Sequence, residues 1–135
     1  MFNSVSCSLI LRGHNLNFEE INKNLHLKPT NVIRKGQVIS KVIGESELDA
    51  WIYKLKFKEK GKINEFIEKF LKIIKPKADY IKDLPNVEDA SLKFYIQSDL
   101  AQIAFEISPI LIKELSKLNL RLEISIFSWG GAEDK

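Results

Sequence analysis

The sequence holds one cysteine, Cys7, in 135 residues, and it has no long apolar run. A single cysteine excludes an internal disulfide and is typical of a reducing compartment. The longest apolar run is far shorter than the ~20 residues that a membrane-spanning helix needs. The first twelve residues lack the basic start of a signal peptide, and their apolar residues alternate with serine. We therefore expect a cytoplasmic protein that does not enter the membrane.

Signatures of metal and nucleotide chemistry are also missing. Cys7, His14 and His26 are the only soft ligands, and their spacing fits no zinc pattern, so we expect no metal. The glycines form neither a P-loop nor a dinucleotide fingerprint. No nucleophile, base and orienting group occur together, so the sequence indicates no catalytic residues. We also expect no cofactor. The sequence thus favours a protein that is not an enzyme.

What is present is the composition of one ordinary globular domain. Apolar residues make up 44% of the chain and charged residues 29%. The length suits a single domain over residues 1–135, with residues 129–135 as a frayed tail. The net charge of +3 implies no polyanionic partner by itself, although residues 54–82 hold ten lysines and only four acidic residues.

Alternation of apolar and polar residues is the dominant pattern, and it predicts strands with one buried face. Helical periodicity and capping residues predict helices between them. The expected strands lie at residues 5–11, 51–57, 92–96, 103–107 and 122–126, and the expected helices at 18–25, 63–74, 78–84 and 109–118.

This order predicts an α+β fold with a mainly antiparallel or mixed sheet of about five strands and helices on one face. The elements from Trp51 to Phe127 match the β-α-β-β-α-β order of a ferredoxin-like unit, with Asp99 to Ala101 at the tip of its hairpin. The segment from Val32 to Asp49 fits either a short edge strand or a loop that covers the sheet.

Two places near the start of the chain are candidates for binding. The turn Arg34-Lys35-Gly36 brings two cations and backbone N–H groups together, which suits an anion, although ordinary solvated charges explain it as well. Arg12 stands at the polar end of the first strand and would join the same patch. His14 follows that strand, where it is either a general base or an ordinary surface histidine.

A third candidate is the polar face of the sheet. Lys56 belongs to a strand whose lysines share one face, and Tyr95 and Phe127 fall out of phase with the core residues of their strands. Cations and aromatic rings on an open sheet suit single-stranded RNA or DNA. Lysines on an exposed strand also prevent aggregation. The same aromatic residues equally suit a protein interface, a dimer contact or a site covered by a loop.

Several short motifs resemble those of the bacterial domain-of-unknown-function family numbered 4279. They are Leu9-x-x-Arg12-Gly13, Leu16, Glu20-Ile21, Leu25, Pro29-Thr30, Lys35-Gly36, Trp51, Pro76, Ser108-Pro109 and Leu115-x-x-Leu118-x-Leu120 to Phe127. The resemblance covers nearly the whole chain and departs from the family around Lys54 to Lys62, which is unusually basic. The family has no established activity. The resemblance implies a small bacterial accessory or immunity-type protein that binds another protein.

The sequence therefore predicts a non-enzymatic module that binds a protein partner or a copy of itself. The residues expected to bind are Arg12, His14, Arg34, Lys35, Gly36, Lys56, Tyr95 and Phe127. The alternatives are binding of single-stranded nucleic acid through the basic sheet face and, third, a domain that binds or converts a small ligand.

Overall fold

The computed structural model describes residues 3–129, so the predicted frayed tail lies outside the described part of the chain except for Trp129. The chain forms a five-stranded mixed sheet with strand order β2-β5-β1-β6-β7, and a separate two-stranded sheet of β3 and β4. The strands are β1 (Ser4–Gly13), β2 (Asn31–Ile33), β3 (Val38–Ser40), β4 (Gly44–Glu45), β5 (Asp49–Phe57), β6 (Val87–Ser98) and β7 (Arg121–Ser128). The predicted α+β class, with its mixed sheet, is confirmed.

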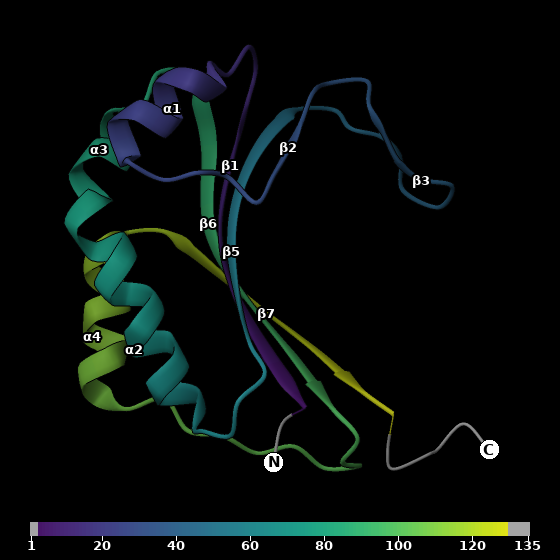
Figure 1. Cartoon of the computed structure of the whole chain (residues 1–135), viewed down its shortest axis with the longest axis vertical. Helices are drawn as coiled ribbons and strands as arrows, with labels where there is room; N and C mark the ends of the chain where they lie inside the picture. The colour runs from purple at the N-terminus through teal and green to yellow at the C-terminus, as the bar shows by residue number, and fades with distance from the viewer. Residues whose placement is uncertain (1–2, 130–135) are drawn as a thin grey trace.

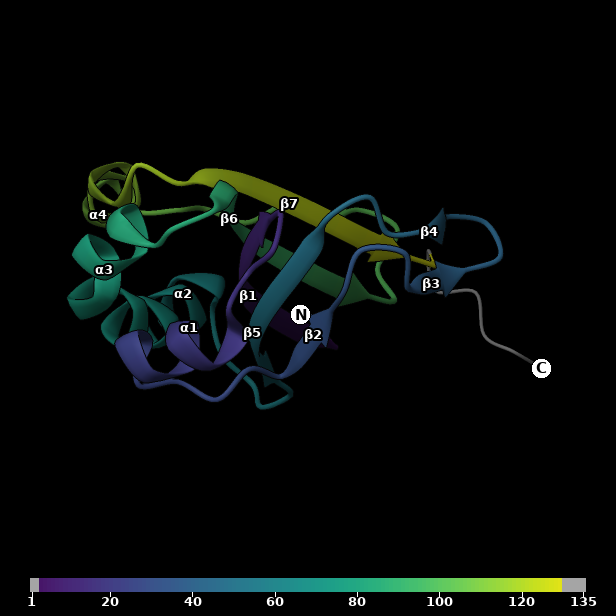
Figure 2. The same ribbon diagram turned by 90° about the horizontal axis from the view of Figure 1, so that it is seen from above.

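The helices cover one face of the large sheet and leave the other face open (Figures 1 and 2). They are α1 (Phe18–Leu25), α2 (Ile63–Ile74), α3 (Ala78–Asp83) and α4 (Pro109–Leu118), with a short 3-10 turn, η1 (Lys75–Lys77), between α2 and α3. The predicted caps are present, because Asn17 accepts from the Glu20 N–H and Ser108 from the Leu111 N–H. None of the described helices has both the length and the apolar character needed to cross a membrane.

The central strand β1 sets which residues face the helices. It pairs antiparallel with β5 on one side and with β6 on the other. Its odd-numbered residues, from Val5 to Leu11, are buried against the helices. On one side they pair with Phe57, Leu55, Tyr53 and Trp51 of β5. On the other side they pair with Ile96, Phe94, Leu92 and Ala90 of β6, which therefore face the helices too. Helix α2 closes this core with a stripe of six buried apolar residues, as its periodicity predicts.

The predicted strand at residues 103–107 is wrong. The chain forms one long strand, β6, and then runs irregularly from Asp99 until α4 begins. Phe105 and Ile107 nonetheless pack on the core. An extended segment laid over a core shows the same alternation as a paired strand, which explains the error. The elements after Trp51 alternate strand and helix, and β6 pairs in parallel with β7, so the ferredoxin-like unit is not confirmed.

The segment from Val32 to Asp49 resolves into two parts. Its first residues belong to β2, which is an edge strand paired with β5. The strands β3 and β4 then form a hairpin that projects from the side of the sheet opposite the helices (Figure 1). We refer to residues 36–46 as the projecting hairpin.

Burial determines the reactivity of Cys7. Its side chain lies in the core, and burial raises the pKa of the thiol to about 12. Because the thiolate is the reactive form, we expect the folded protein to resist alkylation by iodoacetamide at pH 8. The same reagent should modify Cys7 fully in denaturant. Mass spectrometry over a time course measures both rates, and equal rates in the two conditions would contradict the assignment of Cys7 to the core.

Candidate functional site

Four of the predicted binding residues lie on the open face of the sheet. Lys56 and Tyr95 flank Ser6 of the central strand, one from β5 and the other from β6. Phe127 follows on β7, two positions along from the partner of Tyr95, and half of its side chain is exposed. Arg12 lies at the other end of β1. The structure thus groups Lys56, Tyr95 and Phe127 and places Arg12 apart from them.

Ion pairs neutralise the half of this face formed by β6 and β7. The Oδ2 atom of Asp89 lies 2.7 Å from Nη2 of Arg121 and 3.6 Å from Nη1 of Arg12. Lys93 pairs in the same way with Glu123 across the two strands, at 3.3 Å. The hydrogen bond from Arg121 and the charges of the two arginines lower the pKa of Asp89, and they outweigh burial, which acts in the opposite direction. The unpaired positive charge of the open face is therefore concentrated on β5.

The N–H groups of the Arg34-Lys35-Gly36 turn are already used within the chain. The Lys35 N–H donates to Asp49 Oδ1 at 2.7 Å, the Gly36 N–H to the Ser46 carbonyl and the Arg34 N–H to the Gln37 side chain. These donors are therefore not available to an external anion. They serve the internal structure of the loop.

Asp49 is the centre of this arrangement. Only 4% of the residue is exposed, and it stands at the start of β5. Its Oδ2 accepts from the Leu16 N–H and from Arg34 Nη1, both at 3.0 Å. The guanidinium of Arg34 also donates to the Leu16 carbonyl and lies 3.9 Å above the Phe18 ring. We call Asp49 with Arg34, Lys35 and Leu16 the Asp49 anchor.

The surroundings of Asp49 favour its charged form. Burial alone would raise the pKa of this carboxyl group. The N–H groups of Lys35 and Leu16, together with the hydrogen bond and the charge of Arg34, outweigh burial and lower the pKa below its ordinary value. The anchor is therefore charged at neutral pH and ties three segments of the chain together: the turn after β1, the end of β2 and the start of β5.

His14 lies outside both groups. Its Nε2 is 3.5 Å from an Oε atom of Glu88, and about half of each side chain is exposed. An exposed pair of this kind is screened by water and salt and contributes little to stability. The imidazole of His14 thus has a carboxylate neighbour at the surface, but it contacts neither Arg12 nor the Asp49 anchor.

The projecting hairpin exposes apolar side chains that a strand pair in a core would bury. The exposed fraction is 95% for Val42, 67% for Ile43 and 65% for Val38, and Ile39 is also exposed. A hollow of about 320 Å³ lies at the base of the hairpin and is lined by Arg12, Ile39 and Ile43 among others. The hairpin therefore overhangs the Arg12 end of the open face.

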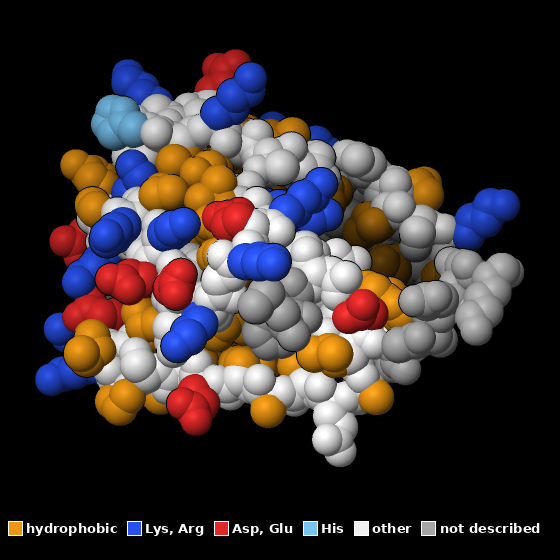
Figure 3. Space-filling view, turned by 60° about the horizontal axis from the view of Figure 1, so that its bottom comes forward, with side chains coloured by type: hydrophobic (Ala, Val, Ile, Leu, Met, Phe, Trp, Pro, Cys, Tyr) orange, Lys and Arg blue, Asp and Glu red, His pale blue; other side chains and the backbone are white. Residues whose placement is uncertain are grey.

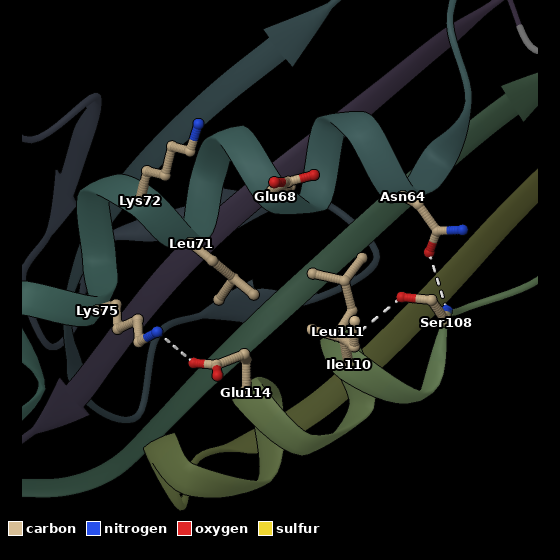
Figure 4. Close-up of a pocket in the computed structure, with 9 residues that line it drawn as sticks. All are labelled: Asn64, Glu68, Leu71, Lys72, Lys75, Ser108, Ile110, Leu111 and Glu114. Atoms are coloured by element: carbon tan, nitrogen blue, oxygen red, sulfur yellow. Dashed lines mark hydrogen bonds and ion pairs between the residues drawn. The ribbon is translucent and has the colours of Figure 1, made fainter.

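A cleft of about 410 Å³ lies on the other side of the molecule, between α2 and α4 (Figure 4). Four of its polar residues pair across it: Asn64 accepts from the Ser108 N–H at 3.1 Å, and Lys75 pairs with Glu114. Leu71 and Leu111 are buried between the two helices, whereas Ile110 is exposed. The cleft is thus a seam where two helices pack. Within residues 3–129, no three His, Cys, Asp or Glu side chains group as a metal site.

Sequence reasoning missed Asp49 and Asp89. Neither has a local signal for its role, since the partners of Asp49 lie 33, 15 and 14 residues away along the chain. A weak signal exists for Asp49, which is a single acid between Leu48 and the apolar start of a strand. An acid in such a position is buried only when it is paired.

Comparison with known proteins gives one result. The family model described as "Domain of unknown function (DUF4279)" matches residues 3–129, which is nearly the whole chain. No curated protein and no solved structure matches the chain.

The Asp49 anchor predicts a stability defect and a pH dependence. Replacing Asp49 with Ala leaves the N–H groups of Leu16 and Lys35 without their acceptor and removes the ion-pair partner of Arg34, and we expect the free energy of unfolding to fall by about 3 kcal/mol. Because the pKa is lower in the folded state, the anchor stabilises the fold at pH values above about 4 and loses this effect as the pH falls through the folded pKa. Urea unfolding from pH 2 to pH 7 measures both effects. Asp49→Asn is the control, since it keeps one acceptor and should lose this part of the pH dependence. A wild-type profile that matches the Asn variant would contradict the role of the charge.

Proposed function

This chain belongs to the DUF4279 family of domains of unknown function, and we propose that it is a non-enzymatic protein-binding module. In this proposal the projecting hairpin, formed by β3 and β4, is the main contact. The observation that carries the proposal is the apolar surface of the hairpin, where Val38, Ile39, Val42 and Ile43 are all exposed within one short segment.

These side chains contribute nothing to the core, so folding does not explain them. A two-stranded hairpin is only marginally stable by itself, and apolar residues exposed together lower solubility. A few residues that become fully buried in a complex supply most of the binding free energy at protein interfaces. Lys41 at the tip and Glu45 near the end of the hairpin add charges of both signs beside the apolar residues. This combination suits an apolar groove with a polar rim on a partner protein.

The Asp49 anchor supports the same proposal, because it holds the hairpin in place. Lys35 is fixed at one end of the hairpin, and backbone hydrogen bonds join Gly36 and Gln37 to Ser46 at its base. A contact element that is ordered before it binds loses less conformational entropy on binding. The anchor thus fixes the position and direction of the hairpin before it binds.

The open face extends the proposed contact. Arg12 lies under the hairpin, and Lys56, Tyr95 and Phe127 present a cation and aromatic rings on the same side of the sheet. Nucleic acid would also use such residues. The ion pairs of Asp89 and Glu123 remove positive charge from that face, and acidic and basic side chains alternate over the helical side (Figure 3). A protein partner therefore fits this surface better than a polyanion does.

Two isoleucine variants test the proposal. Ile43 of the hairpin and Ile110 of α4 are similarly exposed, at 67% and 75%. We expect Ile43→Ser to weaken the complex with a partner at least tenfold, because it removes a contact residue, and Ile110→Ser to leave it unchanged. The partner is first captured from nuclease-treated extract of the source cells, and its dissociation constant is then measured with purified proteins. Both variants should unfold within about 0.5 kcal/mol of the wild type, since neither side chain is buried.

Two results would contradict the proposal. One is equal weakening by the two variants, which would show that the hairpin has no special role. The other is binding that disappears with nuclease and falls steeply with salt, which would favour a nucleic-acid ligand.

A further inference from the structure

The strand β7 is a free edge of the large sheet. Within residues 3–129 it pairs with β6 alone, in parallel and in continuous register from Arg121 to Ser128. The other edge, β2, pairs over only three residues. The molecule therefore presents one long row of backbone N–H and C=O groups, on the outer side of β7, that is available to another strand.

This edge lacks the devices that normally protect one. Its sequence, RLEISIFS, contains neither proline nor lysine, and its register shows no bulge. Its two charged residues, Arg121 and Glu123, are paired with Asp89 and Lys93 of β6. The edge is thus regular in its pairing, free of unpaired charge and open to strand addition.

The apolar side chains of β7 are only half covered. Leu122, Ile124 and Ile126 point to the helix-covered face, where they neighbour Leu92, Phe94 and Ile96, yet 40%, 40% and 49% of these residues remain exposed. A groove of about 260 Å³ lies between the start of β7 and α4, lined by Leu122, Ile107, Ile112 and Leu115 among others. Apolar side chains exposed together beside a free sheet edge are typical of a site where another strand adds.

We infer that this further strand is β7 of a second copy of the chain, antiparallel about a two-fold axis that passes beside Ile124. In this register Ile124 faces Ile124 of the copy, and Leu122 faces Ile126 on both sides of the axis. Glu123 faces Ser125, and Arg121 faces Phe127, a cation beside an aromatic ring. All three half-covered apolar residues find apolar partners, and no two like charges are opposed.

The two neighbouring registers of the β7 pair are less favourable for pairing. A shift by one residue pair toward Glu123 sets that carboxylate against its own copy, which is repulsive. A shift the other way centres the axis on Ser125 and places Leu122 opposite Ser128. The sequence of β7 is therefore complementary to itself in one register, which favours a second copy over an unrelated strand.

The pairing joins two five-stranded sheets into one and is isologous, so it closes without extending into a fibre. It brings the α4 helices toward each other across the groove that holds Ile112. It does not use the projecting hairpin, which follows the opposite edge strand, β2, and lies over Arg12 of the central strand. The dimer does not depend on the partner proposed for the hairpin.

Two substitutions at Ser125 test the inferred register. Ser125 is partly exposed on the open face, so neither Glu nor Lys has to enter the core. In the dimer each new side chain faces Glu123 of the copy, and this pair occurs twice. We expect Ser125→Glu to raise the dimer dissociation constant roughly tenfold, and Ser125→Lys to leave it unchanged or lower it. Sedimentation equilibrium from about 1 µM to about 1 mM measures the constants.

Hydrogen exchange then locates the contact. We expect the outward amides of β7 to become protected as the protein concentration rises, while amides of the hairpin do not change. The variant Ile43→Ser should dimerise like the wild type, so loss of hairpin binding and loss of the dimer are distinguishable. A wild type that stays monomeric at the highest concentration, equal constants for the Glu and Lys variants, or protection confined to the hairpin would each overturn the inference.

Discussion

Pairing on both sides of β1 is the constraint on which the rest of this structure depends. Because β5 and β6 are both antiparallel to β1 and in continuous register along most of it, the odd-numbered residues of β1 define the core face for three strands together. A slip of one residue would turn Trp51 and Phe94 to the open face and bring Lys54 and Lys93 into the core. The same pairing fixes the places of Arg12, Lys56 and Tyr95, so the candidate surface follows from the core.

Alternation in the sequence was sufficient to predict this central part. The strands around β1, β5 and β7 and the helix α2 have a clear period, because one face of each is apolar and turned toward the core. The period failed at residues 103–107, where apolar residues pack on the core although the segment is not a strand. Backbone pairing partners are not encoded in alternation, so neither the single long strand β6 nor its parallel pairing with β7 was foreseeable from that pattern.

The candidate site was less predictable than the fold. Arg34, Lys35 and Gly36 stood out because cations flank a glycine, but their donors turn inward to Asp49 and Ser46, and only the three-dimensional structure brings these groups together. The exposed residues of the hairpin were visible in the sequence as apolar pairs, Val38-Ile39 and Val42-Ile43. Sequence alone could not tell whether they cover the sheet or project from it. The sequence placed Lys56, Tyr95 and Phe127 correctly on one face, because alternate residues of a strand point to the same side of the sheet.

The projecting hairpin also has the features of a segment that unfolds locally. Its hydrogen bonds join its own two strands and its base, and few contacts tie it to the core, so it can open locally at a cost well below that of global unfolding. The state of Asp49 governs that opening, since protonation weakens the hold on Lys35 while the pairs of β1 with β5 and β6 remain. A change of conditions or sequence at the anchor can therefore melt the contact element of an otherwise folded protein.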